Sequence, residues 1–194
     1  MPQLKPTKNV HCSYADYLTW EDGKRWELID GQAVCMSPAP GRQHQQISRL
    51  LERQIDSYLF DKSCEMYHAP FDVRFVETKD NVADDYINTV VQPDIMVICD
   101  PEKLDERGCK GSPDLIVEIL SPSTTRMDMT VKFELYQRYG VKEYWIVHPK
   151  DQTILVFKLL ENGLYGVPDR YCAEDIIPVA LLGELQVDLT QVFR

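Results

Sequence analysis

The sequence lacks long apolar runs. None of its 194 residues lies in an uninterrupted hydrophobic stretch near the roughly 20 residues that a membrane-spanning helix needs. The segment from Met1 to Val10 holds prolines and lysines but no apolar signal region. We therefore expect no membrane partner and a cytoplasmic location.

Closely spaced cysteines are also missing. No two of the cysteines form a C-x-x-C pair, and several lie within apolar runs, where a thiol behaves as a small hydrophobic group. This spacing argues against a zinc site or a disulfide framework and favours a reducing compartment. The cysteines are Cys12, Cys35, Cys64, Cys99, Cys109 and Cys172.

Positive charge is scarce. The chain has 21 lysines and arginines against 31 acidic residues, a formal net charge of -10. Phosphate binding depends mainly on Lys and Arg, so the overall field would repel nucleic acid. A nucleic-acid-binding role then requires a local basic patch, a dimer that concentrates basic residues, or metal ions that neutralise acidic groups in a cleft.

The composition fits one domain with its own core. The chain is 44% apolar and 10% aromatic, and we find no repeats, low-complexity stretches or linker. We therefore expect a single domain over residues 1–194. Within it, Tyr14 to Asp22 predicts a short helix, and Arg25 to Met36 predicts a β-hairpin because Asp30-Gly31 separates two apolar runs.

The remaining pattern alternates helices and strands. Ser37 to Gly41 breaks the hairpin pattern, and apolar residues then recur at helical spacing to about residue 60. The second predicted helix covers Met127 to Tyr139 and ends at Gly140. The predicted strands are Tyr67 to Val76, Val90 to Cys99, Asp114 to Leu120, Glu143 to His148 and Thr153 to Leu160, followed by an irregular apolar tail from Tyr171. This order favours an α/β (α+β) fold, a mixed β-sheet flanked by helices, with a hairpin extension over about 14–36.

Two carboxylates stand where the pattern predicts buried strands. Asp94 and Glu118 lie in stretches whose two faces are both apolar, as in strands at a sheet centre. An ionised carboxylate there is costly unless a cation accompanies it, so two on adjacent strands point to a shared metal ion. The alternative is that each has a private Arg or backbone partner. Asp114 shares a face with Glu118, but four residues along a strand span roughly 13 Å, too far for one ion.

Lys132 lies on the predicted helix that follows Glu118. Asp128, Lys132 and Tyr136 form an i, i+4, i+8 row beside the apolar stripe, from which a lysine can reach back to the sheet. A solvated lysine whose stem lies along the core is an equal alternative. For Asp128, a capping box with Thr125 is favoured over metal ligation.

Arginines repeat on the first predicted long helix. Arg42, Arg49 and Arg53 have a spacing that could face a phosphate backbone, with Arg126 and Arg138 as neighbours. A solvated helix face is the favoured alternative.

Several motifs together resemble a known family. They are Trp26-Glu-Leu-Ile-Asp-Gly, Met36-Ser-Pro, Gln92-Pro-Asp-Ile, Pro113-Asp-Leu-Ile-Val-Glu-Ile-Leu-Ser-Pro-Ser-Thr and Gly140-Val-Lys-Glu-Tyr-Trp-Ile-Val. With these, the chain resembles the bacterial family of putative restriction endonucleases within the PD-(D/E)XK nuclease superfamily. The resemblance covers most of the chain and implies a restriction endonuclease-like core over about 41–160.

The resemblance also implies a catalytic site. Asp94 and Glu118 would hold Mg²⁺, or Mn²⁺ in its place, with a main-chain carbonyl near Ile119. The superfamily places a lysine two residues after the glutamate, where this chain has Leu120, and the family resembled supplies it from the next helix, which makes Lys132 the candidate. Two further positions match the family and are candidates to complete the site: Glu27, otherwise an exposed hairpin residue, and His44, otherwise an ordinary first-turn helix residue.

The chemistry agrees with these residue types. Phosphodiester hydrolysis needs a cation that polarises the phosphoryl group, carboxylates that hold it, and a positive side chain for the developing charge. We expect a Mg²⁺-dependent endonuclease that acts on DNA as a homodimer. The main alternative is a nuclease-fold protein without activity that binds nucleic acid or protein, as the acidic balance and the displaced lysine suggest. An unrelated metal-dependent hydrolase fits the element order less well.

Overall fold

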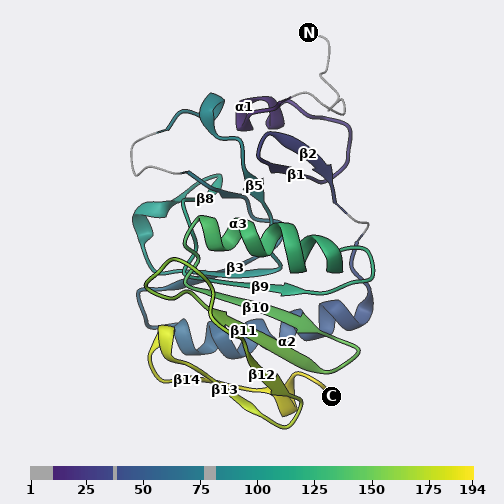
Figure 1. Ribbon diagram of the computed structural model, residues 1–194, viewed down its shortest axis with the longest axis vertical. Helices are drawn as coiled ribbons and strands as arrows, with labels where there is room; N and C mark the ends of the chain where they lie inside the picture. The colour runs from purple at the N-terminus through teal and green to yellow at the C-terminus, as the bar shows by residue number, and fades with distance from the viewer. Residues whose placement is uncertain (1–10, 37–38, 77–81) are drawn as a thin grey trace.

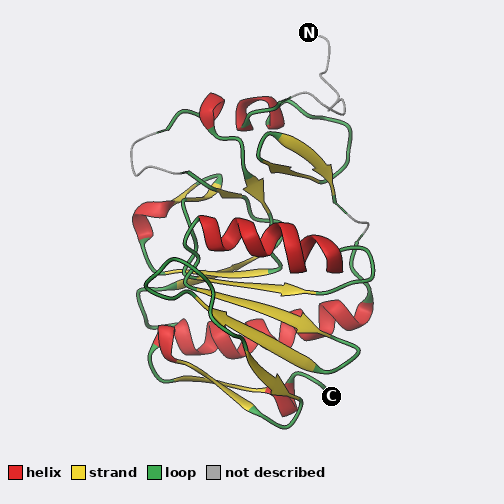
Figure 2. Cartoon of the chain, viewed as in Figure 1, coloured by secondary structure: helices red, strands yellow, loops and turns green. Residues whose placement is uncertain are grey.

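The computed structural model describes residues 11–36, 39–76 and 82–194. The sequence interpretation of Met1 to Val10, and residues Ser37 and Pro38 of the breaker and of the Met36-Ser-Pro motif, lie outside these ranges. Figure 1 shows the arrangement of the elements along the chain, and Figure 2 shows helices on both sides of a central sheet. None of the helices among the described residues combines the length and apolar character needed to cross a membrane.

The central sheet has six strands in the order β12-β11-β10-β9-β6-β3. Strands β9 and β10 run parallel, and the other neighbours are antiparallel. Its strands are β3 (Glu65–His68), β6 (Ile95–Ile98), β9 (Leu115–Ile119), β10 (Glu143–His148), β11 (Thr153–Lys158) and β12 (Asp169–Cys172). The prediction of a mixed α/β fold is confirmed.

A second sheet lies at the N-terminal end of the molecule, in the order β2-β1-β5-β4-β8-β7 (Figure 1). The hairpin is confirmed, with Asp30 at φ 48° and Gly31 at φ 75°, the positive angles that a tight two-residue turn requires. It is not an isolated extension, because β1 also pairs with β5. The strands are β1 (Trp26–Ile29), β2 (Gln32–Cys35), β4 (Val73–Arg74), β5 (Val90–Val91), β7 (Leu104–Asp105) and β8 (Gly108–Lys110). Two short 3-10 helices, η1 (Asp84–Tyr86) and η2 (Pro101–Lys103), lie in its connections.

Two predicted strands are each divided between the two sheets. The prediction of one strand from Tyr67 to Val76 is wrong, because a cis peptide at Ala69–Pro70 separates β3 from β4. The prediction of one strand from Val90 to Cys99 is wrong as well. There β5 and β6 are separated at Pro93, which has no N–H to donate to a strand ladder. The chain therefore passes from one sheet to the other immediately before Asp94.

The two long helices cover opposite faces of the central sheet. The first, α2 (Arg42–Leu59), is confirmed. The second is also found, but it begins as a π-helical segment, η3 (Met127–Lys132), and continues as α3 (Phe133–Arg138). π-helical turns are rare and often occur at functional sites. The predicted short helix is reduced to α1 (Tyr14–Tyr17), which Ser13 caps.

The C-terminal tail is regular, contrary to the prediction. Strands β13 (Ile176–Val179) and β14 (Leu185–Asp188) form an antiparallel hairpin, with the short 3-10 helix η4 (Ala180–Leu182) between them and η5 (Leu189–Gln191) after β14. The inward residues of the hairpin alternate with exposed ones and join the core beside α2. Period-two alternation was therefore present in the sequence over two short stretches.

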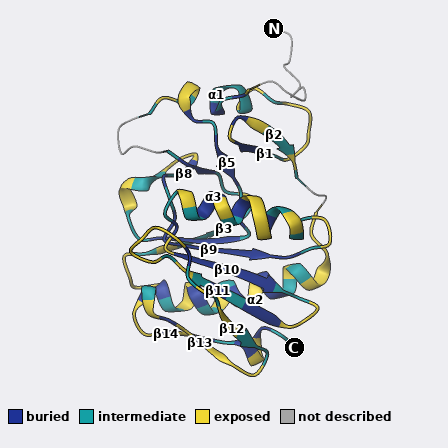
Figure 3. Cartoon of the chain, viewed as in Figure 1, coloured by how far each residue is buried: buried dark blue, intermediate teal, exposed yellow. Residues whose placement is uncertain are grey.

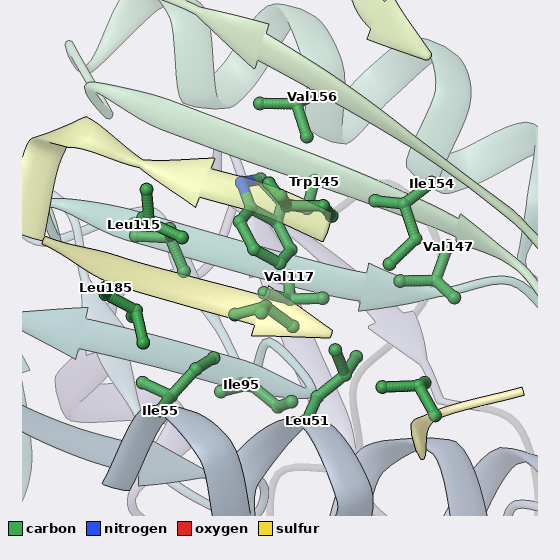
Figure 4. Close-up of a cluster of buried hydrophobic side chains, with 14 of the residues drawn as sticks. Leu51, Ile55, Ile95, Leu115, Val117, Trp145, Val147, Ile154, Val156 and Leu185 are labelled. Carbon is green, nitrogen blue, oxygen red and sulfur yellow. The ribbon is translucent and has the colours of Figure 1, made fainter. Parts of the chain in front are cut away.

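The core has two parts, one on each face of the central sheet. On the α2 side, Trp145 and Val117 of the sheet pack against Leu51 and Ile55 of the helix (Figure 4). On the other side, Ile116 and Met96 pack with Tyr136 of α3. The central strands are thus buried on both faces (Figure 3), which is the environment that the sequence indicated for Glu118.

One disulfide joins Cys64 and Cys99, which corrects the expectation of unpaired thiols. Glu65 lies across from Ile98 in the β3–β6 ladder, so the next pair of the register is Cys64 and Cys99. The sequence concealed this pair because the two cysteines are 35 residues apart.

Candidate active site

The β6–β9 register places two carboxylates side by side. Ile95 lies across from Val117, and the next pair of this antiparallel ladder is Asp94 and Glu118. Glu118 is 4% exposed within β9, as expected. Asp94 precedes β6 and its side chain is 23% exposed, so the expectation that it lies inside a fully buried strand is wrong.

Lys132 reaches the sheet from the helix. Its Nζ lies 2.9 Å from Glu118 Oε1, 2.9 Å from Glu27 Oε1 and 3.8 Å from Asp128 Oδ1. All four side chains are buried. Burial acts to lower the pKa of Lys132, but the charges of its carboxylate neighbours raise that pKa well above its usual value. Lys132 is therefore a fixed ammonium group, not a solvated helix cation.

Glu118 has a second donor in Tyr136. The fully buried Tyr136 hydroxyl donates to Glu118 Oε1 at 2.7 Å, the same oxygen that Lys132 contacts. Burial raises the pKa of Glu118 to about 8, opposed by Lys132 and aided by the other carboxylates. The site thus disfavours the ionised form of Glu118 even with Lys132 in place.

His44 connects Asp94 to the main chain of β9. Its Nε2 lies 3.1 Å from Asp94 Oδ2, and the same oxygen accepts a hydrogen bond from the Ile119 N–H at 2.8 Å. Burial lowers the pKa of His44, but the Asp94 carboxylate opposes burial and, together with the Ile119 backbone, raises that pKa.

A cavity of about 1060 Å³ unites these groups. It is lined by every residue that the sequence proposed for the site: Glu27, His44, Asp94, Glu118, Ile119 and Lys132. Glu27 comes from β1 of the second sheet and is 4% exposed, so it is not an exposed hairpin residue.

Sequence reasoning set aside one member of this cluster. Asp128 lines the same cavity and is 2% exposed, although a capping role was favoured for it. Thr125, the expected capping partner, instead donates its hydroxyl to the Ser121 carbonyl. The spacing of Asp128 and Lys132 was the signal that could have identified it, since both lie on one face of the helix.

The cluster gathers more carboxyl groups than basic side chains. Four carboxyl groups, from Glu27, Asp94, Glu118 and Asp128, lie beside two basic side chains, Lys132 and His44. Burial raises the pKa of Glu118 and of Asp128, and a divalent cation at the site would favour their ionised forms.

The donors available for a cation are few but suitable for Mg²⁺. Across the described ranges, no three His, Cys, Asp or Glu side chains are placed to hold a metal ion by themselves. Mg²⁺ uses only one or two protein carboxylates and keeps several waters. The contacts of Asp94 given above end on Oδ2, and those of Glu118 end on Oε1, which leaves one oxygen of each for a further ligand. The residues therefore fit this ion.

Comparison with known proteins gives consistent matches. Residues 14–190 match the model of the family Uma2, described as "Putative restriction endonuclease". The uncharacterized protein slr1290 of Synechocystis sp. is 32% identical over 171 residues, which cover 87% of this chain and 84% of that protein. A crystal structure of a "putative nuclease belonging to DUF820" from Anabaena variabilis superposes with a TM-score of 0.72 at 19% identity, and covers 93% of this chain and 97% of that one. At that identity, the likeness shows a shared fold.

Proposed function

Because the chain belongs to the Uma2 family of putative restriction endonucleases, we propose that it hydrolyses DNA phosphodiester bonds with the help of a divalent cation. The observation that carries the proposal is the placement of Lys132 against Glu118, beside Asp94 on the neighbouring strand. In this interpretation the central sheet and its two helices form a restriction endonuclease-like core.

Asp94, Glu118 and the Ile119 carbonyl would hold Mg²⁺ or Mn²⁺. When bound there, such an ion supplies charge that polarises the scissile phosphate and activates a water molecule. The surplus of carboxyl groups over basic side chains and the free carboxylate oxygens support this assignment.

Lys132 would stabilise charge and not accept a proton. Its raised pKa keeps it protonated near neutral pH, so it can donate hydrogen bonds to a phosphate oxygen or to the attacking water. Glu27 and Glu118 fix the direction of its side chain from opposite sheets.

His44 would position Asp94. Its Nε2 contacts the carboxylate oxygen that the Ile119 N–H also holds, so the other oxygen keeps a constant direction. His44 Nδ1 is buried and has no hydrogen-bond partner within the described part of the chain. An orphaned buried nitrogen of this kind supports a bound group at the site.

The second candidate is a nuclease-fold protein that binds without cutting. Leu120 at the usual lysine position and the net charge of -10 favour it. It predicts that divalent-cation binding and cleavage are both absent. A homodimer also remains a prediction, and analytical ultracentrifugation would test it.

Plasmid cleavage in Mg²⁺ or Mn²⁺ tests the proposal. The parent should cut supercoiled DNA and stop in EDTA, whereas Asp94→Ala and Lys132→Ala should each lose on the order of 100-fold in rate. Lys158→Ala is the matched control, since that exposed lysine pairs with Asp169 on strands far along the sheet. Equal residual cutting by parent and site variants would refute the assignment.

A further inference from the structure

We propose that Arg25, Arg42 and Arg49 form an arginine wall that binds the phosphodiester backbone of a nucleic-acid strand at the mouth of the cavity. The inference rests on the proposed function, because it names how the substrate of that site is held. It also answers the main objection from the sequence, which is the acidic balance of the chain.

The arginines of the cavity lie at its surface, and its buried charged groups lie deeper. Arg25, Arg42 and Arg49 line the same cavity as the carboxylates, but all three are exposed, whereas Glu118 and Lys132 are buried. A strand that approaches from solvent would meet guanidinium groups first and the carboxylate cluster last. This is the local basic patch that a chain of net negative charge needs.

The three arginines have no carboxylate partner among the described residues, whereas other arginines do. The arginine salt bridges of the described part join Arg74 to Asp105, Arg107 to Asp84 and Arg138 to Asp30. Positive charge at the cavity is therefore left for an external anion. Arg53 differs: it lies on the same helix and is exposed, but it does not line the cavity, so the three helix arginines of the sequence analysis do not act as one set.

Arg25 is held in place by Gln92. The side-chain oxygen of Gln92 accepts from Arg25 Nε at 3.2 Å and from Nη2 at 2.6 Å. Its amide nitrogen donates to Asp72 at 2.8 Å and to the Tyr17 hydroxyl at 3.2 Å. A guanidinium group has about five N–H donors, so roughly three remain for a ligand. A side chain ordered beforehand loses less entropy when it binds.

Gln92 also fixes the position of Arg25 relative to the carboxylates of the site. It stands two residues before Asp94, and its backbone N–H donates to Glu27 at 3.0 Å. Arg25 is thereby tied to the segment that carries the first carboxylate of the site. We therefore assign Arg25 to the phosphate nearest the reacting bond.

Arg42 and Arg49 extend the wall along α2. Seven residues of helix correspond to a rise of roughly 10 Å and to nearly two full turns, so both side chains leave the same side. Along one nucleic-acid strand that rise corresponds to about three nucleotides. The two arginines can therefore contact separate phosphates of one strand.

Fluorescence anisotropy with labelled oligonucleotides tests the wall. Binding is measured in Ca²⁺, as single strand and as duplex, over a series of salt concentrations. Each of Arg25→Ala, Arg42→Ala and Arg49→Ala should weaken binding roughly tenfold and reduce the slope of log affinity against log salt by about 0.7 to 0.9. Arg53→Ala should change neither quantity, and the two oligonucleotide forms show which of them the wall accepts.

Two results of the binding assay would overturn the inference: no binding by the parent, or cavity variants that behave like Arg53→Ala. Thermal melts of each variant, and Arg25→Lys as a charge-preserving change, separate a folding defect from a lost contact. The test of the proposed function is independent of the test of the arginine wall. Arginine-dependent binding without cleavage contradicts the nuclease proposal and leaves the wall, whereas cleavage that survives all three arginine changes contradicts the wall alone.

Discussion

Lys132 Nζ lies 2.9 Å from Glu118 Oε1, although one belongs to a helix and the other to the preceding strand. The pair gives the site a lysine without requiring one at position 120, where Leu120 instead joins the apolar core beneath α3. The ammonium group of Lys132 therefore reaches the Glu118 carboxylate from the helix and not from the strand that carries Glu118.

Loss of the lysine charge should destabilise the protein. Lys132→Met leaves buried Glu27 and Glu118 facing each other without a cation, so we expect a loss of about 3 kcal/mol of unfolding free energy. Urea denaturation in EDTA measures it. Adding Glu27→Gln and Glu118→Gln to this variant should recover part of the loss, and a Lys132→Met protein as stable as the parent would contradict the buried network.

Tyr136→Phe should affect the site through Glu118. It removes one buried hydrogen bond, at about 1 kcal/mol of stability, and frees Glu118 Oε1 to turn, so cation affinity should fall roughly tenfold. Tyr165→Phe is the matched control, because its hydroxyl donates to the Val141 carbonyl and not to the site. Calorimetric titration with Mn²⁺ distinguishes them, and equal affinities for both variants would show that Tyr136 has only a structural role.

Divalent cations should stabilise the folded chain. The surplus of carboxyl groups over basic side chains favours cation binding to the native state, so Mn²⁺ at about 100 times its dissociation constant should add about 2.7 kcal/mol to stability. Thermal melts with and without EDTA measure the shift. Asp94→Asn should lose most of it, while the remote surface change Asp188→Asn should retain it; a shift of the same size in both variants would place the ion elsewhere.

Reduction of the disulfide should lower stability. The Cys64–Cys99 bond closes a loop of 35 residues, so the chain-entropy account gives a stabilisation of about 3 to 4 kcal/mol. Cys64→Ser with Cys99→Ser should unfold at lower urea concentration than the parent under non-reducing conditions. With dithiothreitol the two should coincide, and Cys172→Ser serves as a free-thiol control. Identical urea unfolding curves of all three proteins without reductant would show that the bond does not form.

Glu143 should make stability dependent on pH. It is 3% exposed, accepts from Trp145 Nε1 at 2.7 Å, and burial raises its pKa. A carboxyl group with a raised folded pKa stabilises the protein at low pH and loses that contribution as pH rises through the folded value. Glu143→Gln should therefore melt like the parent near pH 4 and above it at pH 7. A parallel pH dependence in both proteins would exclude this role.

The sequence predicted the helices and strands that depend on a local pattern of residues. Alternation and helical spacing located both long helices and the strand of Glu118, because burial on two faces leaves a continuous apolar run. The divided strands escaped prediction, since the apolar pattern continues through Pro93 while the backbone changes sheets. The Lys132 contact depended on family resemblance, because its geometry requires the fold. Asp128 was given a capping role, although its partner Lys132 lies only four residues away. Gln92 was not recognised, since its partners are distant in sequence.

Lys132 joins Glu27 of one sheet to Glu118 of the other, and this has a consequence for the nascent chain. Neither sheet alone contains the full set of charged groups, so the site is complete only when the two sheets are docked. A chain still emerging from the ribosome, or one caught with its sheets apart, holds an incomplete set. Any reaction that needs the complete set of charged groups therefore requires both sheets to be folded and docked.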